Sequence, residues 1–404
     1  MKKPELLLPA GNLAKLKIGL QYGGDAFFMG FSPFSLRSKQ GGFNKEDILE
    51  GIHLLRKAGK TAYVTMNIYP RSDKFIPLKN HIEFVRDEIK PDALIVADPG
   101  FFDLIKEVWP EAEIHMSVQA NVLNYKSVEF WKKQGATRVI LPRELMLQDI
   151  KTIHEKVPDI ELEFFVHGAI CMAYSGRCLL SNYMTGRDSN QGACSHSCRW
   201  KYKVHLEEEK RPGEFYPVEE DENGTYIMNS KDNCMLPYLK ELVDAGICSF
   251  KVEGRNKSEY YLSTVAKAYR TAIDDMIAGK DFNQNLLKEV SKTASRGFIP
   301  GYLFGFPEDG DVYYESSAPI QSHKFVGIVT GRQKNGLYKI SVRNKLVKGA
   351  EIEIMTPDKD FLCNIDEMFD LEENEIESIH GGAGEKFVKI NYNIPVGSIL
   401  RVKS

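Results

Sequence analysis

Four of the seven cysteines in this chain lie between residues 171 and 198. They are Cys171, Cys178, Cys194 and Cys198, and Cys234 follows further along the chain. Cysteine thiolates are soft ligands that bind zinc or iron–sulfur clusters. The spacings here, C-x6-C and C-x3-C, differ from the C-x2-C spacing of zinc sites and from the close-packed cysteines of ferredoxins. Spacing alone therefore favours an iron–sulfur cluster over zinc, but only weakly.

A catalytic thiol is the alternative that these residues leave open, because His167 and His196 lie nearby in the sequence and a histidine can activate a cysteine. That interpretation uses one thiol and leaves the others unexplained. His167 ends an apolar stretch, where it is a candidate base, a partner of another site residue or a polar end of a strand. The chain contains neither H-E-x-x-H nor G-x-S-x-G. These absences exclude a zincin protease and the nucleophile elbow of an α/β-hydrolase.

Several charged and amide side chains directly follow apolar stretches and are candidate binding or catalytic residues. Arg143 lies in LPREL, and Glu253 and Arg255 lie in VEGRNKS. Arginine binds carboxylates through two parallel hydrogen bonds, although Arg143 and Arg255 could equally form structural ion pairs with Glu144 and Glu253. The amides that could bind a base edge or a small substrate are those of Asn67, Gln119 and Asn121.

The elements that must position these residues alternate between short apolar stretches and longer amphipathic ones, as in residues 44–59. Such alternation demands a parallel sheet, and eight units fit a (β/α)8 TIM-like barrel better than an open sheet. No G-x-G-x-x-G follows an early strand, which weighs against a Rossmann fold. The predicted strands are residues 5–9, 26–30, 62–67, 93–98, 113–118, 137–142, 161–166 and 248–253.

A long insertion separates the seventh and eighth predicted strands and contains most of the cysteines. Loops that follow barrel strands lie on the carboxyl face, where barrel enzymes place their chemistry. After the final helix the pattern changes to period-two alternation with a K-N-G turn, which is typical of antiparallel strands. We therefore predict a barrel over residues 1–280 with an insertion at 168–247, a connection at 281–320 and a small antiparallel β-barrel at 321–404.

Composition indicates an ordinary globular protein, with 43% hydrophobic and 27% charged residues among 404. We expect a cytoplasmic protein with no membrane contact, because neither a signal peptide nor a long apolar span is visible, and disulfides are disfavoured there. The net charge of −3 gives no general attraction to nucleic acid, so RNA would have to bind a local basic patch. One candidate patch is Arg177, Arg187, Arg199, Lys201 and Lys203, and a second is Lys324, Arg332, Lys334, Lys339, Arg343, Lys345 and Lys348.

The stretch ELEFFVHGAICMAYSGRCLLS resembles the signature of peptidase family U32, a family named after a collagenase-like protease activity. The match includes Glu163, Phe165, Gly168, Ala169, Cys171, Gly176, Cys178 and Ser181. The blocks LLLPAGNLAKL, MSVQANVLN, NQGACSHSCRWKY, MNSKDNCML and SFKVEGRNKS resemble the family in the same order. The resemblance covers nearly the whole chain.

Within this family, the chain resembles most closely the proteins that make 5-hydroxyuridine at the tRNA wobble position. The resemblance implies an iron–sulfur-dependent RNA hydroxylation factor with prephenate as a small-molecule cosubstrate. The partners that it implies are tRNA and a protein of the same family. The alternative that the family name implies is a collagenase-like peptidase. Hydroxylation of a pyrimidine is a redox reaction that side chains alone do not perform, which agrees with a cofactor.

The resemblance also implies a ligand set for a cluster of the 4Fe–4S type. Its members are Cys171, Cys178, Cys194 and Cys234, with Cys198 as the alternative fourth ligand. The expected catalytic residues are Arg143, His167, Glu253 and Arg255, and the expected substrate-binding residues are Asn67, Gln119 and Asn121.

Overall fold

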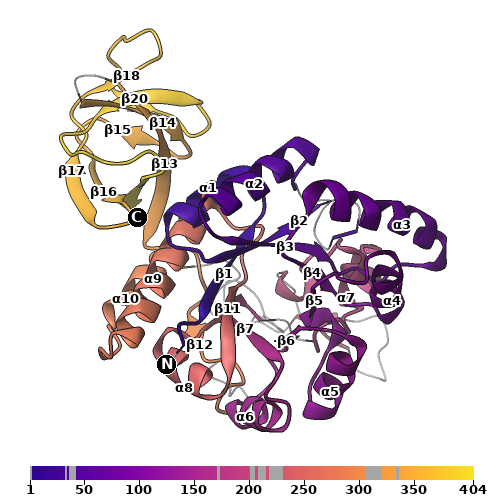
Figure 1. Cartoon of the computed structure of the whole chain (residues 1–404). Coiled ribbons are helices and arrows are strands. Elements are labelled where there is room, and N and C mark those ends of the chain that lie inside the picture. Colours follow the sequence, from indigo (N-terminus) through magenta and orange to yellow (C-terminus); the bar gives the residue numbers. More distant parts are fainter. Residues whose placement is uncertain are drawn as a thin grey trace.

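A closed barrel of eight parallel strands surrounded by helices forms the larger part of the computed structural model (Figure 1). The barrel closes because β11 pairs in parallel with both β1 and β7. The predicted (β/α)8 barrel is thereby confirmed. Its strands are β1 (Glu5–Ala10), β2 (Ala26–Gly30), β3 (Thr61–Met66), β4 (Ala93–Val96), β5 (Ile114–Met116), β6 (Arg138–Leu141), β7 (Glu161–Ala169) and β11 (Ile247–Val252). The structure describes residues 2–31, 34–35, 42–170, 173–200, 205–207, 215–217, 231–305, 320–333 and 336–404.

The helices of the barrel follow its strands and cover them on the outside. Several begin at an asparagine or aspartate whose side chain accepts a hydrogen bond from the first turn, as Asn44 does from the backbone of Asp47. The helices are α1 (Leu13–Gln21), α2 (Lys45–Lys57), α3 (Phe75–Phe84), α4 (Pro99–Val108), α5 (Tyr125–Gln134), α6 (Leu147–Lys156), α8 (Leu239–Asp244), α9 (Glu259–Ile277) and α10 (Asn285–Val290). Within the described ranges, no helix is both long and apolar enough to cross a membrane.

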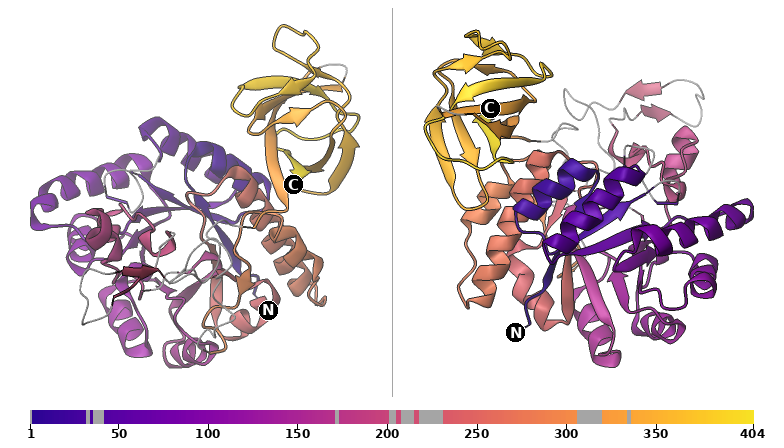
Figure 2. Two further views of the ribbon diagram at one scale, coloured as in Figure 1. Left: turned by 180° about the vertical axis from the view of Figure 1, so that it is seen from behind. Right: turned by 45° about the horizontal axis from the view of Figure 1, so that its top comes forward.

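The insertion predicted between the seventh and eighth strands is present and lies over the carboxyl face of the barrel (Figure 2). It contains α7 (Leu180–Thr185) and the paired strands β8 (His205–Glu207) and β9 (Phe215–Pro217). It returns through β10 (Asp232–Cys234), which pairs antiparallel with the end of β7 and in parallel with β12 (Phe298–Ile299). This pairing extends β7 to Ala169, beyond the strand end predicted at residue 166.

A separate antiparallel sheet follows the barrel and curls around its own apolar core. Its strand order is β17-β16-β21-β13-β14-β20-β18. A further pair, β15 (Leu346–Val347) and β19 (Ser378–Ile379), lies beside it. The seven strands are β13 (His323–Arg332), β14 (Leu337–Val342), β16 (Glu351–Met355), β17 (Asp360–Asn364), β18 (Met368–Phe369), β20 (Glu385–Lys389) and β21 (Ile399–Lys403).

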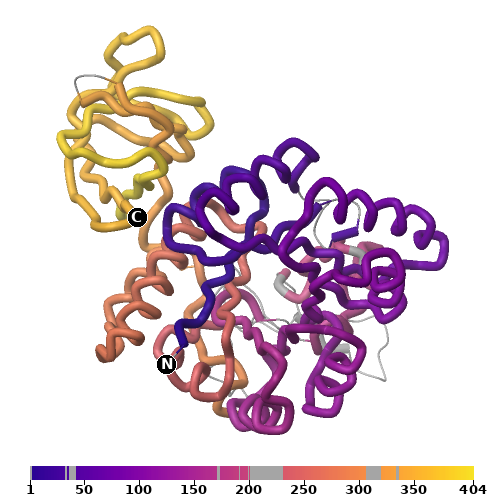
Figure 3. The backbone as a smooth tube through the Cα atoms, viewed as in Figure 1, coloured from indigo at the N-terminus to yellow at the C-terminus, as the bar shows by residue number. Residues whose placement is uncertain are grey.

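The C-terminal sheet packs against α1, α9 and α10, with β21 on the side that faces the barrel (Figure 3). Arg401 on β21 is fully buried, and its guanidinium contacts Glu289 of α10 and lies 2.7 Å from a carboxylate oxygen of Glu353. The hydroxyl of Tyr22, at the end of α1, donates a 2.8 Å hydrogen bond to the carbonyl of Met355. Apolar side chains and ion pairs therefore join the two parts.

Candidate functional site

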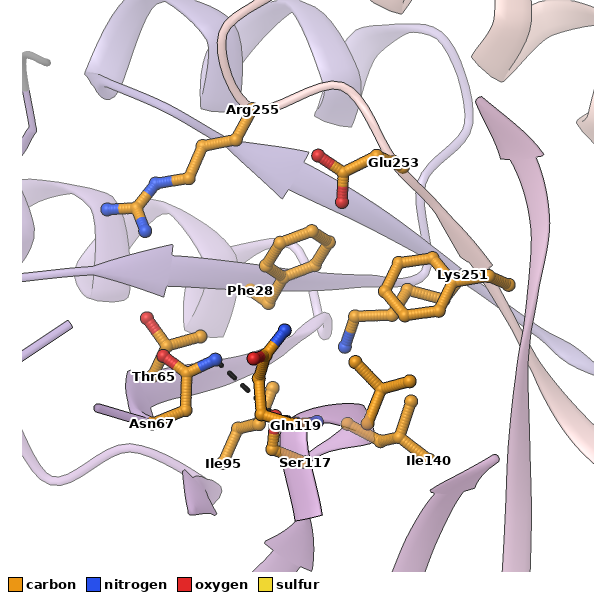
Figure 4. A pocket seen from close by; sticks show the side chains of 12 residues that line it. Phe28, Thr65, Asn67, Ile95, Ser117, Gln119, Ile140, Lys251, Glu253 and Arg255 are labelled. Carbon is orange, nitrogen blue, oxygen red and sulfur yellow. Dashed lines mark hydrogen bonds between the residues drawn. The ribbon is translucent and has the colours of Figure 1, made fainter. Parts of the chain in front are cut away.

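Two adjoining cavities lie at the carboxyl face of the barrel, where barrel enzymes hold their substrates. The inner cavity, of about 90 Å³, opens among the ends of the barrel strands (Figure 4). Its walls combine aromatic and aliphatic side chains with polar ones. They are Phe28, Thr65, Asn67, Ile95, Ser117, Val118, Gln119, Ile140, Phe165, Lys251, Glu253 and Arg255.

Lys251 supplies one of the two buried positive charges that line the inner cavity. It comes from β11, is 4% exposed, and lies with its Nζ 2.7 Å from a carboxylate oxygen of Glu163 on β7. The same Nζ lies 4.4 Å from the ring centroid of Phe28 and 5.5 Å from that of Phe165. Burial lowers the pKa of Lys251, whereas the charge of Glu163 raises it. Its ammonium is thus positioned by one carboxylate and two aromatic faces.

A buried ionic network beneath Lys251 holds this charge in place. Glu163 is fully buried, and Arg138 lies 3.1 Å from its carboxylate and 2.8 Å from that of Glu5. Burial alone would raise the pKa of Glu163, but the charges of Lys251 and Arg138 outweigh it and lower that pKa. Glu163 therefore stays ionised, and paired charges replace water in the barrel interior.

Arg255 follows β11 and contributes a second cation, which lies on the other side of the Phe28 ring from Lys251 in Figure 4. It is 5% exposed, and its guanidinium donates a 3.0 Å hydrogen bond to the hydroxyl of Ser35. Gly30, at the end of β2, makes room for it. A Cβ at that position would lie 1.6 Å from Nη2 of Arg255, so a side chain there would displace the guanidinium.

The outer cavity, of about 390 Å³, contains three of the five candidate cluster ligands. Cys178, Cys194 and Cys198 all line it, and it shares four residues with the inner cavity. The shared residues are Val118, Gln119, Phe165 and Glu253. Three thiols in one cavity are a donor set of the type that iron–sulfur clusters use. Cys171 lies outside the described residues.

Two close backbone contacts hold the cysteine-bearing segment against the barrel. Gly176 has φ +74°, and a Cβ there would lie 2.1 Å from the carbonyl oxygen of Gln119. One residue earlier, Ser175 donates a 2.6 Å backbone hydrogen bond to a carboxylate oxygen of Glu144. The segment that carries Cys178 is therefore seated directly on the strand ends that form the inner cavity.

Cys234 lies apart from the other three cysteines. On β10 it is 3% exposed, is paired with His167 of β7 and has its sulfur 3.8 Å from the hydroxyl of Tyr269. Burial raises the pKa of this thiol to about 11. Cys234 does not line the outer cavity, whereas Cys198, the alternative ligand, does. Within the described ranges, no three cysteine sulfurs come within 4.8 Å of one another.

His167 is not positioned as a base for either cavity. Its ring is fully buried between β7 and α9, and lies 5.4 Å from the ring of Tyr269 and 5.3 Å from that of Phe298. Burial lowers its pKa to about 3, so it is neutral. The pairing of β7 with β11 shifts in register just before His167. Lys251 pairs with Phe165, but the next residue of β11, Val252, pairs with His167. In the described structure His167 packs against aromatic rings and lines neither cavity, and its catalytic role stays a prediction.

The other predicted residues divide between the cavities. Gln119 and Glu253 line both, Asn67 and Arg255 line the inner one, and Arg143 lines the outer one. The guanidinium of Arg143 lies 3.9 Å from the ring centroid of Phe165. Asn121 lines neither cavity, because it ends the turn at residues 118–120 in a left-handed conformation with φ 53°.

Lys251 is a site residue that the sequence analysis does not single out. The stretch CSFKVE is predicted as a strand, and a lysine within it alternates with Phe250 and Val252. Those neighbours face the surrounding helices, so Lys251 must face the barrel interior. A charged residue on the inner face of a barrel strand is the signal that could have identified it.

The fold and the site define a TIM-like barrel protein with a cysteine-bearing insertion at its carboxyl face. The chain belongs to peptidase family U32, whose model matches residues 11–312, and the model of the family's C-terminal domain matches residues 321–401.

Curated relatives of this chain include two bacterial proteins named tRNA hydroxylation protein P. The one from Escherichia coli (strain K12) is 42% identical, over 88% of this chain and 87% of its own length. The one from Haemophilus influenzae is 38% identical, over 100% of this chain and 96% of its own length. A solved structure of a U32 peptidase is 13% identical with a TM-score of 0.42, covering 62% of this chain and 93% of that one.

Proposed function

We propose that this protein is an iron–sulfur-dependent tRNA hydroxylation factor that forms 5-hydroxyuridine at the wobble position with prephenate as cosubstrate. One structural observation carries the proposal: three cysteines line a cavity that adjoins a polar, cation-bearing cavity at the carboxyl face of the barrel. The relatives named tRNA hydroxylation proteins, which are similar over almost the whole chain, support the part of the proposal that concerns tRNA hydroxylation.

Three of the proposed ligands, Cys178, Cys194 and Cys198, line one cavity, which supports the proposal of an iron–sulfur cluster. When bound, the cluster would supply redox chemistry that no side chain of the barrel provides. Its proposed ligands are Cys171, Cys178 and Cys194 with a fourth cysteine, and the outer cavity favours Cys198 for that position over Cys234. Cys234 would have to lose a proton that its burial holds tightly.

The inner cavity suits a small anionic molecule with a flat face. Lys251 and Arg255 offer N–H donors on either side of the Phe28 ring, and Asn67 and Gln119 offer amides. We propose that the carboxylates of the cosubstrate bind these two cations, while Glu253 lies at the junction with the outer cavity. Arg143 lies on the outer side, where it can contact the RNA.

Two measurements test the cluster and the activity separately. Anaerobically purified protein should be brown, absorb near 400 nm by thiolate-to-iron charge transfer, and contain iron and acid-labile sulfide. Cys178→Ser and Cys194→Ser should lose the colour and iron, whereas Cys363→Ser, in the C-terminal sheet, should keep both. Iron retained by both of the first two variants would overturn the ligand assignment.

The fourth ligand follows from a matched pair of variants. We expect Cys198→Ser to lower the iron content and Cys234→Ser to preserve it. The reverse outcome would mean that the cysteine-bearing segment folds toward β10 when the cluster binds, and would assign Cys234 instead.

The activity itself is read from RNA. Nucleosides of tRNA from a host lacking its own hydroxylation genes should contain 5-hydroxyuridine when the wild-type chain is expressed and none when Cys178→Ser is expressed. If the wild-type chain restores no 5-hydroxyuridine, the proposed function is wrong.

The peptidase alternative would use His196, which also lines the outer cavity and could activate a cysteine there. Its signature would be cleavage of a protein substrate that depends on one thiol. We expect no cleavage of gelatin or casein by purified protein. Sustained cleavage that disappears in Cys178→Ser, Cys194→Ser or Cys198→Ser would instead support a thiol peptidase.

A further inference from the structure

Large apolar side chains are exposed on the segment that carries Cys178, Cys194 and Cys198. In the described part of the chain, five of the fifteen exposed large apolar residues fall within residues 174–200. We call these five the aromatic rim: Tyr174, Leu179, Tyr183, Met184 and Trp200, which are 59%, 69%, 88%, 42% and 44% exposed. Isolated exposed apolar residues are ordinary, but such a concentration marks an interaction surface.

The aromatic rim is continuous with the outer cavity. Tyr174 is itself part of the cavity wall, and Leu179 lies between Cys178 and Leu180, which both line it. Tyr183 and Met184 are on α7, and Trp200 follows Cys198 by two residues, with its indole N–H donating a 3.2 Å hydrogen bond to the carbonyl of Ser195. The rim residues therefore belong to the same short segments as the cysteines that line the outer cavity.

Two exposed arginines, Arg177 and Arg187, interrupt the rim in the sequence. Alternating arginine and aromatic side chains are typical of surfaces that stack bases and contact phosphates of single-stranded nucleic acid. The rim therefore has the composition of a surface that binds single-stranded nucleic acid.

The second basic patch predicted from sequence belongs to the C-terminal sheet, and several of its side chains form ion pairs with carboxylates. Lys339 lies 2.5 Å from Glu385, and Lys348 lies 2.6 Å from Glu375 and 3.0 Å from Glu377. Arg343 lies 3.5 Å from Glu259 of α9, and Lys334 lies outside the described residues. Three of the seven patch residues therefore already face carboxylates, so the patch has less charge left for phosphate, which favours the rim.

We propose that the aromatic rim, with Arg177 and Arg187, is the docking surface for a single-stranded RNA loop whose target base enters the outer cavity. This inference rests on the proposed function. It adds the surface to which the RNA binds and the single-stranded conformation of the bound RNA. Enzymes that modify a base must take it out of its stack, and a loop base costs less to extrude than a paired one. The rings of Tyr183 and Trp200 replace the stacking that the neighbouring bases lose.

Binding of a fluorescently labelled RNA to the full-length protein tests this surface without requiring turnover. The probes are a short hairpin with a single-stranded loop and the same sequence fully paired as a duplex. Tyr183→Ala and Trp200→Ala should each raise the Kd for the hairpin by about 5- to 150-fold, the range expected when one base no longer stacks on a ring. Neither variant should change the slope of log K against log salt, because no charge is removed.

The arginines should behave differently from the rings. Arg177→Ala and Arg187→Ala should weaken binding and flatten that slope by about 0.7 for each phosphate that the protein no longer neutralises. Matched controls are Phe130→Ala on α5, an aromatic residue that is 52% exposed, and Arg56→Ala on α2, which is also exposed. Both lie away from the rim, and we expect both to bind RNA as the wild-type chain does.

Unchanged hairpin affinity in the ring variants, or equal affinity for hairpin and duplex, would overturn the inference. An RNA-independent association that the ring variants abolish would also overturn it and would indicate a protein partner. Absence of hydroxylation with intact RNA binding by the rim would refute the proposed function alone, so the two failures are distinguishable.

Discussion

At the scale of single residues, the barrel interior combines two buried charges that depend on each other. Lys251 and Glu163 lie 2.7 Å apart, and both are almost completely excluded from solvent. Removing one partner of such a pair leaves the other as an uncompensated buried charge, which costs about 3–5 kcal/mol. Function and stability can be separated here by removing both charges together.

We expect Lys251→Met to be destabilised by about 3 kcal/mol, the lower end of that range, because Arg138 still faces Glu163. Lys251→Met combined with Glu163→Gln should regain most of this stability in thermal or denaturant unfolding. Binding of the small anionic cosubstrate, followed by calorimetry, should be abolished in both. If the double variant binds it as the wild-type chain does, Lys251 is a purely structural residue.

Gly30 offers a second test at this scale, because the space of its missing side chain is occupied by Arg255. Gly30→Ala should displace the guanidinium and lower the affinity for the cosubstrate by at least 10-fold, the factor that about 1.4 kcal/mol produces. Gly331→Ala is the matched control, since a Cβ there meets only a side-chain carbon of Lys339 at 3.6 Å. Equal affinity in both variants would show that Arg255 does not bind the ligand.

At the scale of elements, most of the architecture could be predicted from sequence. Apolar stretches between turn residues identify all eight barrel strands, because a parallel strand is buried on both faces. Strands β4 and β5 end earlier than predicted, at Val96 and Met116, whereas β7 ends later, at Ala169. Residues 167–169 are polar or small and are held in the strand by β10, a partner distant in sequence.

The candidate site was predictable to a lesser degree. Arg255, Gln119 and Asn67 follow strands directly, and their positions follow from the strand ends alone. His167 and Cys234 do not, because a shift in the pairing of β7 with β11 and the packing of α9 decide which way they face. Strand register and helix packing depend on residues distant in the chain, so no local sequence pattern predicts the orientation of His167 or Cys234.

At the scale of the whole molecule, the C-terminal sheet is not an independent appendage. Phe325, Ile328, Met355 and Ile399 belong to the apolar core of the barrel, and Arg401 is buried among carboxylates from both parts. Deleting this sheet would expose part of the barrel core. RNA binding by the sheet is therefore better tested by single charge changes, such as Lys345→Ala, than by truncation.

The carboxylates around Arg401 predict a dependence of stability on pH. Burial would raise the pKa of Glu353, but Arg401 and Lys292 outweigh it and lower that pKa from 4.5 to about 2. A carboxyl group with a depressed pKa in the folded state contributes stability above its unfolded pKa and loses it as the pH falls toward the folded value. Glu289, whose pKa is also lowered, acts in the same direction.

The midpoint of thermal unfolding should therefore fall as the pH decreases from about 4.5 toward 2. Arg401→Met with Glu353→Gln should show a weaker dependence in this window than the wild-type chain. Glu385→Gln, which removes an ion pair with Lys339, should retain most of the wild-type dependence, because exposed ion pairs contribute little to stability. Identical curves for all three proteins would show that the interface does not titrate.

The shifted pairing of β7 with β11 also has an evolutionary consequence. It separates two groups of contacts that follow one another along β7. Glu163 and Phe165 contact Lys251, whereas His167, beyond the shift, contacts Tyr269 and Phe298. Substitutions in diverging relatives should therefore be correlated within each group and independent between them. Relatives in which His167 is replaced should also differ at Tyr269 or Phe298 while retaining Lys251 and Glu163. Selection would then act on packing at one end of β7 and on charge pairing in the rest of the strand.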